Sequence, residues 1–147
     1  MMPMTEEFYD EEEELGCFRF NPSEEELILD YLLPKLGFHQ PNTIYLLEDR
    51  DNIYAKEPWR LNHTENDIFE PNEWFYFVKR TNRKVKGWKA TGELKDVVSK
   101  KTGEVIGKKR NLRFYVEGDE SKTSGWTMRE YSSIGNQNQR LCHLKGP

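Results

Sequence analysis

The sequence has few of the residues that would indicate a metal site, a disulfide framework or a membrane span. Its 147 residues include two cysteines, Cys17 and Cys142, which lie far apart and have neither a CxxC partner nor a histidine at zinc-ligand spacing. We therefore expect two reduced, buried thiols and no metal or cofactor. No apolar run approaches the roughly 18 residues of a membrane-spanning helix, and the N-terminus is acidic rather than signal-like. These absences predict a soluble intracellular protein.

Catalytic patterns are missing as well. The three histidines, His39, His63 and His143, share no spacing with one another and have no nearby cysteine or arrangement of acids. The sequence holds no Ser/His/Asp or Cys/His nucleophile pattern and no glycine-rich phosphate loop. Because no residues are candidates for catalysis, we do not expect an enzyme.

Charge is abundant but unevenly distributed. Charged residues make up 33% of the chain and the net charge is −4, which taken whole argues against nucleic acid as a partner. Residues 1–14 contain seven of the 26 acids and none of the 22 basic residues, so residues 15–147 carry a net charge of +3. We expect residues 1–14 to form a disordered acidic tail. Residues 15–147 are expected to form one folded domain, able to bind DNA if its basic residues are clustered.

One long helix is predicted near the start of the folded part. Ser23 fits an N-cap and Glu26 completes a capping box, with three acids in the first turn. Pro34 stops the helix soon after a run of apolar residues at helical spacing, which comprises Leu27, Ile28, Tyr31 and Leu32. A second, short helix is expected around Pro58, which suits a first helical turn.

The rest of the chain is predicted to form strands. They are rich in aromatic or alternating apolar residues and are separated by turn residues, and they cover 73–78, 87–92, 94–99, 105–106, 111–117, 126–132 and 140–145. Residues 35–52 have little periodicity and are expected to form a loop. One helix, a small helix and then a run of antiparallel strands predict an α+β domain.

Seven short motifs in this order resemble those of the NAC family of plant transcription factors. Residues 18–27 are similar to GFRFxPTDEEL, and residues 51–61 to DxYxxxPWxL. Residues 73–77 resemble EWYFF, and residues 87–92 match the signature GxWKATG closely. Residues 107–115 resemble GxKKxLxFY, residues 126–131 resemble WxMHEY, and residues 141–145 resemble the closing VLCRIYKK. Any one motif would be weak, but seven in the family's order over nearly the whole folded part are specific.

This resemblance implies the NAC-domain fold, a twisted antiparallel β-sheet packed between an N-terminal helix and a short second helix. It also implies a nuclear transcription-factor domain that binds double-stranded DNA with a CGT-type core, as a homodimer or as a heterodimer with other NAC proteins. The residues that match the family's inter-subunit salt bridge are Arg19 and Glu26, although Glu26 has a competing local role in the capping box. The dimer interface implied by the resemblance comprises Leu15, Gly16, Cys17, Phe18, Arg19 and Glu26.

The signature strand can also be interpreted from its residue types. A short edge strand fits the major groove, and small side chains let its backbone approach the bases. Alternation directs Lys89 and Thr91 to one face and Trp88 and Ala90 to the other, so that Trp88 anchors the strand and Lys89 reads bases. An ordinary solvated strand is the alternative.

Basic residues upstream of this strand are expected to contact phosphates, although a solvated loop is again the alternative. Asn82-Arg83 resembles the family's Asn-Arg pair in this loop, and Lys95 matches the lysine that closes the signature. The whole DNA-binding set expected is Lys79, Arg80, Arg83, Lys84, Lys86, Trp88, Lys89, Ala90, Thr91, Gly92, Lys95, Lys108 and Lys109.

Several departures from the family pattern bear on DNA affinity. The basic loop before the signature strand is shortened to residues 79–86, and residues 116–120 include acids where the family has a segment rich in glycine and lysine. Cys17 replaces a glycine and Arg129 replaces a histidine. These changes leave an alternative function open: a dimerisation module that pairs with other NAC proteins and inhibits them, with weak or no DNA binding of its own.

Overall fold

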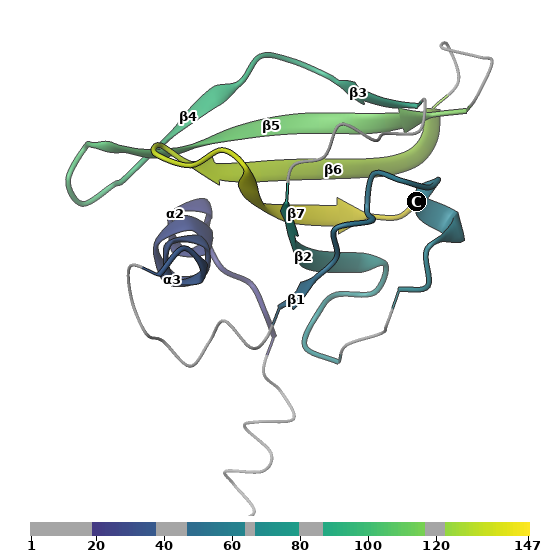
Figure 1. Ribbon diagram of the computed structural model, residues 1–147, viewed down its shortest axis with the longest axis horizontal. Coiled ribbons are helices and arrows are strands. Elements are labelled where there is room, and N and C mark those ends of the chain that lie inside the picture. Colours follow the sequence, from purple (N-terminus) through teal and green to yellow (C-terminus); the bar gives the residue numbers. More distant parts are fainter. Residues whose placement is uncertain (1–18, 38–46, 64–66, 80–86, 117–122) are drawn as a thin grey trace, which may run out of the picture.

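The computed structural model describes residues 19–37, 47–63, 67–79, 87–116 and 123–147 (Figure 1). The predicted acidic tail, residues 15–18 of the predicted dimer interface, the basic loop 80–86 and the acidic segment 117–120 lie outside these ranges. In the described part, one helical segment packs against one face of a twisted sheet, and residues 53–61 contribute to the core on the other face.

The helical segment begins where the sequence predicts it. The Ser23 Oγ accepts the Glu26 N–H at 3.1 Å and the Glu26 Oε1 accepts the Ser23 N–H at 2.9 Å, which confirms the capping box. The segment comprises α2 (Glu24–Glu26), a π-helical stretch η1 (Leu27–Leu32) and α3 (Leu33–Lys35). It ends one residue after Pro34, in agreement with the prediction. No helix in the described ranges is long and apolar enough to cross a membrane.

The sheet has seven strands in the order β1-β2-β7-β6-β5-β3, with β4 paired to β5 beside this path. The strands are β1 (Glu48–Asp49), β2 (Glu73–Lys79), β3 (Trp88–Ala90), β4 (Lys95–Val98), β5 (Val105–Tyr115), β6 (Thr123–Ser133) and β7 (Gln139–Lys145). All pairs are antiparallel except β1 with β2, which is parallel. The predicted α+β fold with a twisted, mostly antiparallel sheet is therefore confirmed.

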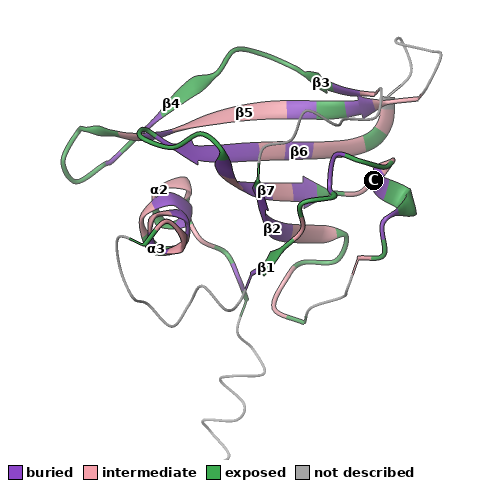
Figure 2. Ribbon diagram, viewed as in Figure 1, coloured by how far each residue is buried: buried purple, intermediate pink, exposed green. Residues whose placement is uncertain are grey.

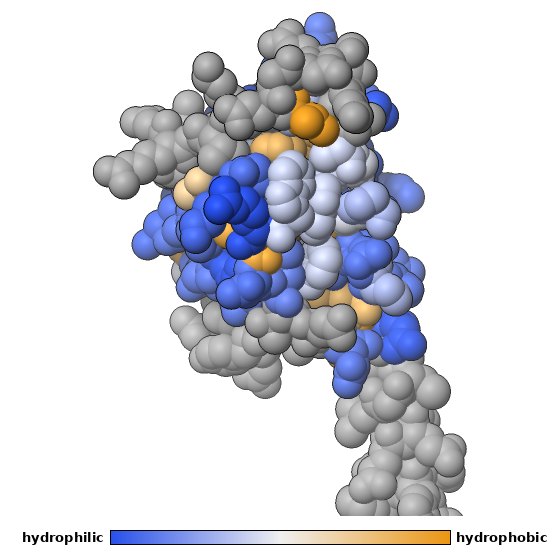
Figure 3. Space-filling model, turned by 90° about the vertical axis from the view of Figure 1, so that its right-hand side faces the viewer, coloured by the Kyte–Doolittle hydropathy of each residue, from blue (hydrophilic) through white to orange (hydrophobic). Residues whose placement is uncertain are grey.

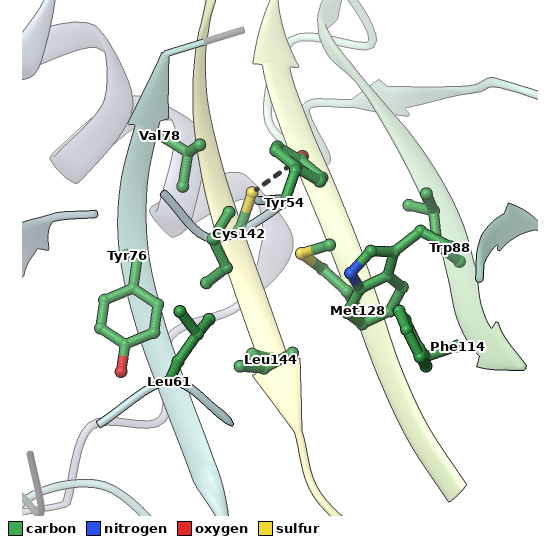
Figure 4. Packing of buried hydrophobic residues seen from close by; sticks show 11 residues of the cluster. Tyr54, Leu61, Tyr76, Val78, Trp88, Phe114, Met128, Cys142 and Leu144 are labelled. Atoms are coloured by element: carbon green, nitrogen blue, oxygen red, sulfur yellow. Dashed lines mark hydrogen bonds between the residues drawn. The ribbon is translucent and has the colours of Figure 1, made fainter. Parts of the chain in front are cut away.

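The strands contain many buried residues (Figure 2), and these form two apolar clusters, one on each face, because strand residues alternate between the faces. On the helix face, Ile28 and Leu32 pack with Phe77 of β2. On the opposite face, a second cluster joins residues 53–61 to the sheet (Figure 4). There the Tyr54 hydroxyl lies 3.6 Å from the Sγ of Cys142, a buried free thiol as expected.

Several elements differ in extent from the prediction: β6 begins at Thr123 rather than at 126, and β3 covers only Trp88–Ala90 of the predicted 87–92. The ranges 105–106 and 111–117 form one continuous strand, β5, because the polar residues between them pair with β4 on one side and β6 on the other. Glu48–Asp49, inside the predicted loop, pairs with β2. The second helix is a single 3-10 turn, η3 (Pro58–Arg60).

Candidate nucleic-acid interface

The signature motif forms the strand at one edge of the sheet. β3 pairs with β5 in antiparallel register, with Trp88 opposite Phe114. Pairing extends past the strand's last residue, because the Thr91 N–H donates to the Asn111 carbonyl at 2.9 Å. Among the described residues, no strand pairs with the outer side of β3. The outer side of this short strand is the part of the sheet that a groove could receive.

Trp88 fixes the strand to the core. It is 8% exposed, and its ring meets the Phe114 ring edge to face with 5.2 Å between centroids (Figure 4). Gly87 makes this packing possible, since it has a φ of +135° and a Cβ there would lie 2.6 Å from the Phe114 ring. The Phe114 ring also packs edge to face against the Trp59 ring, with 5.3 Å between the centroids. The start of β3 is thus set by packing within the chain itself.

The residues that follow Trp88 face solvent. Lys89, Ala90, Thr91 and Gly92 are all exposed. The Lys89 Nζ lies 5.9 Å from the centroid of the Tyr115 ring, which places its charge over an aromatic face. The edge of the sheet therefore presents one cation followed by three small residues.

A row of residues that the sequence analysis did not identify runs inward from Lys89. Arg113 on β5 lies opposite Lys89, Thr127 on β6 lies opposite Arg113, and Lys145 on β7 lies opposite Thr127. Residues directly opposite one another share a face of the sheet, so these four side chains form one line, which we call the basic row. One sequence alone could not reveal it, because spacing along a strand does not give the register across strands.

A second row lies beside the basic row on the same face and comprises Asn111, Arg129 and His143. The Arg129 Nε donates to the Asn111 Oδ1 at 2.8 Å, and the His143 Nε2 lies 2.7 Å from the Glu73 carboxylate. Burial lowers the pKa of His143, although the hydrogen bond with Glu73 opposes this. Residues of both rows, together with Thr91, line a hollow of about 260 Å³.

The end of the molecule where β5, β6 and β7 meet η3 carries no broad apolar patch among its described residues. Figure 3 looks at this end, and hydrophilic or only weakly polar residues cover most of the described surface, with small hydrophobic areas between them. A surface of this kind suits a charged, hydrated partner better than an apolar one.

The other described cations of the predicted DNA-binding set lie apart from Lys89. Lys79 ends β2 and Lys95 begins β4, and both are exposed. Lys108 forms an ion pair with an aspartate across the β4–β5 hairpin, and the Lys109 Nζ contacts the Glu24 carboxylate at 2.7 and 2.9 Å. Because Lys108 and Lys109 are adjacent on β5, they point to opposite faces.

Glu24 ties the start of the helix to the sheet. Its carboxylate accepts hydrogen bonds from Lys109 and, at 3.0 Å, from the Tyr131 hydroxyl, and it lies 3.5 Å from Arg129. Burial raises the pKa of Glu24, but these hydrogen bonds and positive charges outweigh it and hold the pKa below its ordinary value. Arg129 therefore has a negative neighbour at the inner end of the hollow.

Of the remaining predicted site residues, Arg19 and Glu26 lie within the described ranges. Arg19 and Glu26 have contacts within the chain, because the Arg19 Nη1 donates to the Asp67 carbonyl at 3.2 Å and Glu26 closes the capping box. The Glu26 carboxylate still has acceptor capacity for a second partner. The predicted site residues that lie outside the described ranges are Leu15, Gly16, Cys17, Phe18, Arg80, Arg83, Lys84 and Lys86.

Histidine and cysteine have structural surroundings where they are described. His63 lies between the Tyr76 hydroxyl at 2.7 Å and the Pro58 carbonyl at 2.9 Å. Burial lowers the pKa of His63, which favours the neutral ring. Within the described ranges, no group of three or more His, Cys, Asp or Glu side chains has the arrangement of a metal site.

Comparison with known proteins agrees with the motifs and the fold. Residues 15–133 match the family model described as No apical meristem (NAM) protein. The chain is 33% identical over 126 residues to NAC domain-containing protein 68 of Oryza sativa subsp. japonica, which covers 78% of this chain and 38% of that protein. It is 34% identical over 130 residues to Protein CUP-SHAPED COTYLEDON 1 of Arabidopsis thaliana, which covers 80% of this chain and 41% of that protein.

A third relative, NAC transcription factor NAM-1 of Hordeum vulgare subsp. vulgare, is 32% identical over 133 residues, which cover 80% of this chain and 32% of that protein. The chain thus spans about a third to two fifths of the length of these curated relatives. The family model, in contrast, matches most of the chain. This chain belongs to the NAC family, whose members share the NAM domain.

Proposed function

We propose that this chain is the sequence-specific, double-stranded DNA-binding domain of a nuclear transcription factor, and that the Trp88–Gly92 strand reads a CGT-type core in the major groove. Its main support is the geometry of β3. Trp88 is fixed in the core while Lys89 and the small residues after it are exposed at the sheet edge. A relative named as a NAC transcription factor adds to this support. A short, pre-positioned strand suits a groove about 12 Å wide.

Each residue of the strand has a definite contact in this arrangement. Lys89 donates to guanine N7 or O6, while Ala90 and the Thr91 methyl group contact thymine methyls. The cations that flank the strand contact phosphates and so add affinity without sequence information, and they comprise Lys79, Arg80, Arg83, Lys84, Lys86 and Lys95. Lys108 and Lys109 act mainly through the long-range field, because they lie toward the hairpin end of β5, apart from Lys89, and both form ion pairs.

The domain acts as a dimer in this proposal, either a homodimer or a heterodimer with other NAC proteins. The interface comprises residues 15–19 together with Glu26, and the inter-subunit ion pair joins Arg19 to Glu26. An exposed ion pair contributes only about 0–1 kcal/mol. The apolar side chains of Leu15, Cys17 and Phe18 must therefore supply most of the association free energy.

Fluorescence anisotropy with CGT-core and scrambled duplexes tests the division of roles. Lys89→Ala is expected to lower the ratio of the two affinities by roughly ten-fold, since a specific base contact discriminates by about 1–3 kcal/mol. Lys84→Ala is expected to weaken binding to both duplexes by similar factors. Lys101→Ala, which removes one exposed cation from the far hairpin turn, serves as the matched control.

Two outcomes would count against this function. Equal losses of discrimination in Lys89→Ala and Lys84→Ala would refute the assignment of base reading to β3. If the homodimer ignores both duplexes at low salt but forms mixed dimers readily with another NAC protein, the chain is an inhibitory dimerisation module instead. The shortened basic loop and the acids in residues 117–120 are the features that favour this second function.

A further inference from the structure

We propose that the hollow beside the basic row is a phosphodiester-binding subsite, which holds one strand of the DNA backbone while β3 lies in the groove. This inference rests on the proposed function and adds a surface to it. None of Arg113, Thr127 or Lys145 belongs to the DNA-binding set predicted from the sequence.

The basic row places like charges along one line of the sheet, and the line ends at Glu73, which lies opposite Lys145 and 4.0 Å from its Nζ. Lys89 and Arg113 are directly opposite one another on paired strands, and like charges in this position destabilise a sheet. Lys145 continues the same line two strands further in, after the small polar Thr127. An anion seated in the hollow would offset this repulsion and contact Arg113 and Lys145, while Lys89 contacts a base.

The second row makes the hollow suitable for an anion of limited size. The Arg129 guanidinium is oriented by its bond to Asn111, so its position is partly fixed before a ligand arrives. The two acids near the hollow are shared among several groups: Glu24 binds Lys109 and Tyr131 and lies 3.5 Å from Arg129, and Glu73 binds His143 and lies 4.0 Å from Lys145. The volume of about 260 Å³ is many times the roughly 10–15 Å³ that one water needs on the same measure, which leaves room for a hydrated phosphate group.

The spacing of the strands fits the dimensions of DNA. Neighbouring strands lie about 4.8 Å apart. The β5 strand, which carries Arg113, is therefore about 5 Å from β3, and the β6 strand, which carries Thr127 and Arg129, is about 10 Å from it. The major groove is about 12 Å wide, so its walls lie roughly 6 Å to either side of a strand centred in it. A backbone on the helix side of β3 therefore lies over β5 and β6, near Arg113 and Arg129, and Lys145 on β7 lines the far side of the same hollow.

A double variant with a matched control tests the subsite. Arg113→Gln with Lys145→Gln removes two exposed cations of the basic row, and Lys100→Gln with Lys101→Gln removes two exposed cations from the hairpin turn at the other end of β5. The basic-row variant is expected to bind both CGT-core and scrambled duplexes about ten-fold more weakly. Its plot of log affinity against log salt should be shallower by about 0.9 for each phosphate that the variant no longer neutralises. The ratio between duplexes should stay unchanged.

If the basic-row variant matches the hairpin control in affinity and salt slope, while Lys89→Ala still loses discrimination, the subsite is wrong and the proposed function stands. If the unchanged chain binds neither duplex, the proposed function fails by itself. The subsite is then tested by titrating inorganic phosphate, with chloride at equal ionic strength as reference, while the His143 ring resonances are followed by NMR. A saturable shift that the basic-row variant abolishes supports a phosphate site, and the absence of such a shift overturns it.

Discussion

Trp88 and Lys89 are neighbours in the chain with opposite environments. Trp88 is 8% exposed, whereas Lys89 projects from the edge of the sheet. Strand alternation produces this difference, because one side chain enters the core when the next leaves it. The buried indole restricts where the lysine can be, so less conformational freedom is lost when the lysine meets a base. A single anchored residue therefore restricts the position of the one beside it, as the proposed function of Lys89 requires.

Gly87 is expected to be as important for this geometry as the residues that are proposed to contact DNA. Gly87→Ala would place a Cβ 2.6 to 2.9 Å from three atoms of the Phe114 ring, at a φ of +135°. The variant should lose about 1–3 kcal/mol of unfolding free energy and should shift β3. Urea denaturation measures the loss, and duplex discrimination should fall with it. Gly135→Ala is the control, since its Cβ would meet nothing within 4 Å, and equal losses in both variants would contradict this explanation.

Glu130 is a buried carboxylate that joins two arginines across strands. Its Oε1 accepts from Arg110 at 2.9 Å and its Oε2 from Arg140 at 2.9 Å, and Glu130 is only 4% exposed. Burial raises the pKa of Glu130, with the Arg140 charge and hydrogen bond opposing this. The carboxylate thus depends on its two partners, and they depend on it.

Glu130→Gln is expected to destabilise the domain strongly, because it leaves two partly buried guanidinium groups without their counter-charge. Removal of one partner from a buried ion pair costs about 3–5 kcal/mol. Denaturation with guanidinium chloride at pH 7 measures the difference in unfolding free energy between the variant and the unchanged chain. Glu93→Gln, at an exposed position, should change that free energy by less than about 0.5 kcal/mol. A Glu130→Gln variant as stable as the Glu93→Gln variant would show that the network is dispensable.

At the scale of elements, the sequence predicts what each segment forms better than where the segment lies. The capping box at Ser23 and the aromatic strand 73–78 depend on residues close together in the chain, and both are found as expected. The sequence predicts β5 as two pieces because its middle is polar, and only the strands on both sides show that it is continuous. The basic row cannot be predicted from the sequence for the same reason, because only the register between paired strands brings its residues into one line.

The attachment of the helix to the sheet is expected to be sensitive to acid. The pKa of Glu24 is held below the ordinary 4.5 by Lys109, Tyr131 and Arg129, despite an opposing effect of burial. A carboxyl group with a lowered folded-state pKa stabilises the fold above its unfolded-state pKa. That contribution disappears as the pH falls from about 4.5 through the folded-state pKa.

Glu24→Gln should remove this part of the pH dependence. After allowance for solvent screening, the contribution at pH 7 is on the order of 1 kcal/mol. Urea unfolding at a series of pH values from 7 to 3 should show a smaller fall in stability for the variant than for the unchanged chain. Glu104→Gln, in the exposed hairpin turn, should leave the profile as it is. A profile of Glu24→Gln that overlies the original would mean that the contact with Lys109 does not stabilise the fold.

At the scale of the whole molecule, the sheet has one closed face and one face that is partly open. The helix covers one part of its face through Ile28 and Leu32, and the same face continues into the open rows around Arg113. The opposite face is closed by residues 53–61 and holds Trp88. A sheet with a core on both faces can therefore keep its edge strand rigid while a basic surface beside it stays open.

The net charge of −4 arises from the acids of residues 1–14, without which the chain carries +3. Deletion of residues 2–14 is therefore expected to raise affinity for any duplex several-fold at about 0.1 M salt, where the Debye length is about 10 Å. The gain should shrink toward 1 M salt, where that length is about 3 Å, and discrimination should stay constant because no base contact changes. Anisotropy at several salt concentrations measures this.

Replacement of the seven acids by Gln and Asn separates charge from chain length, because the segment then keeps its size and loses its charge. If electrostatic repulsion limits DNA binding, the neutralised chain and the deleted chain should show the same gain in affinity and the same decline of that gain with salt. If only the deletion strengthens binding, the segment excludes DNA by its volume. In that case the uneven charge of the chain has no bearing on how strongly its basic surface attracts a phosphate backbone.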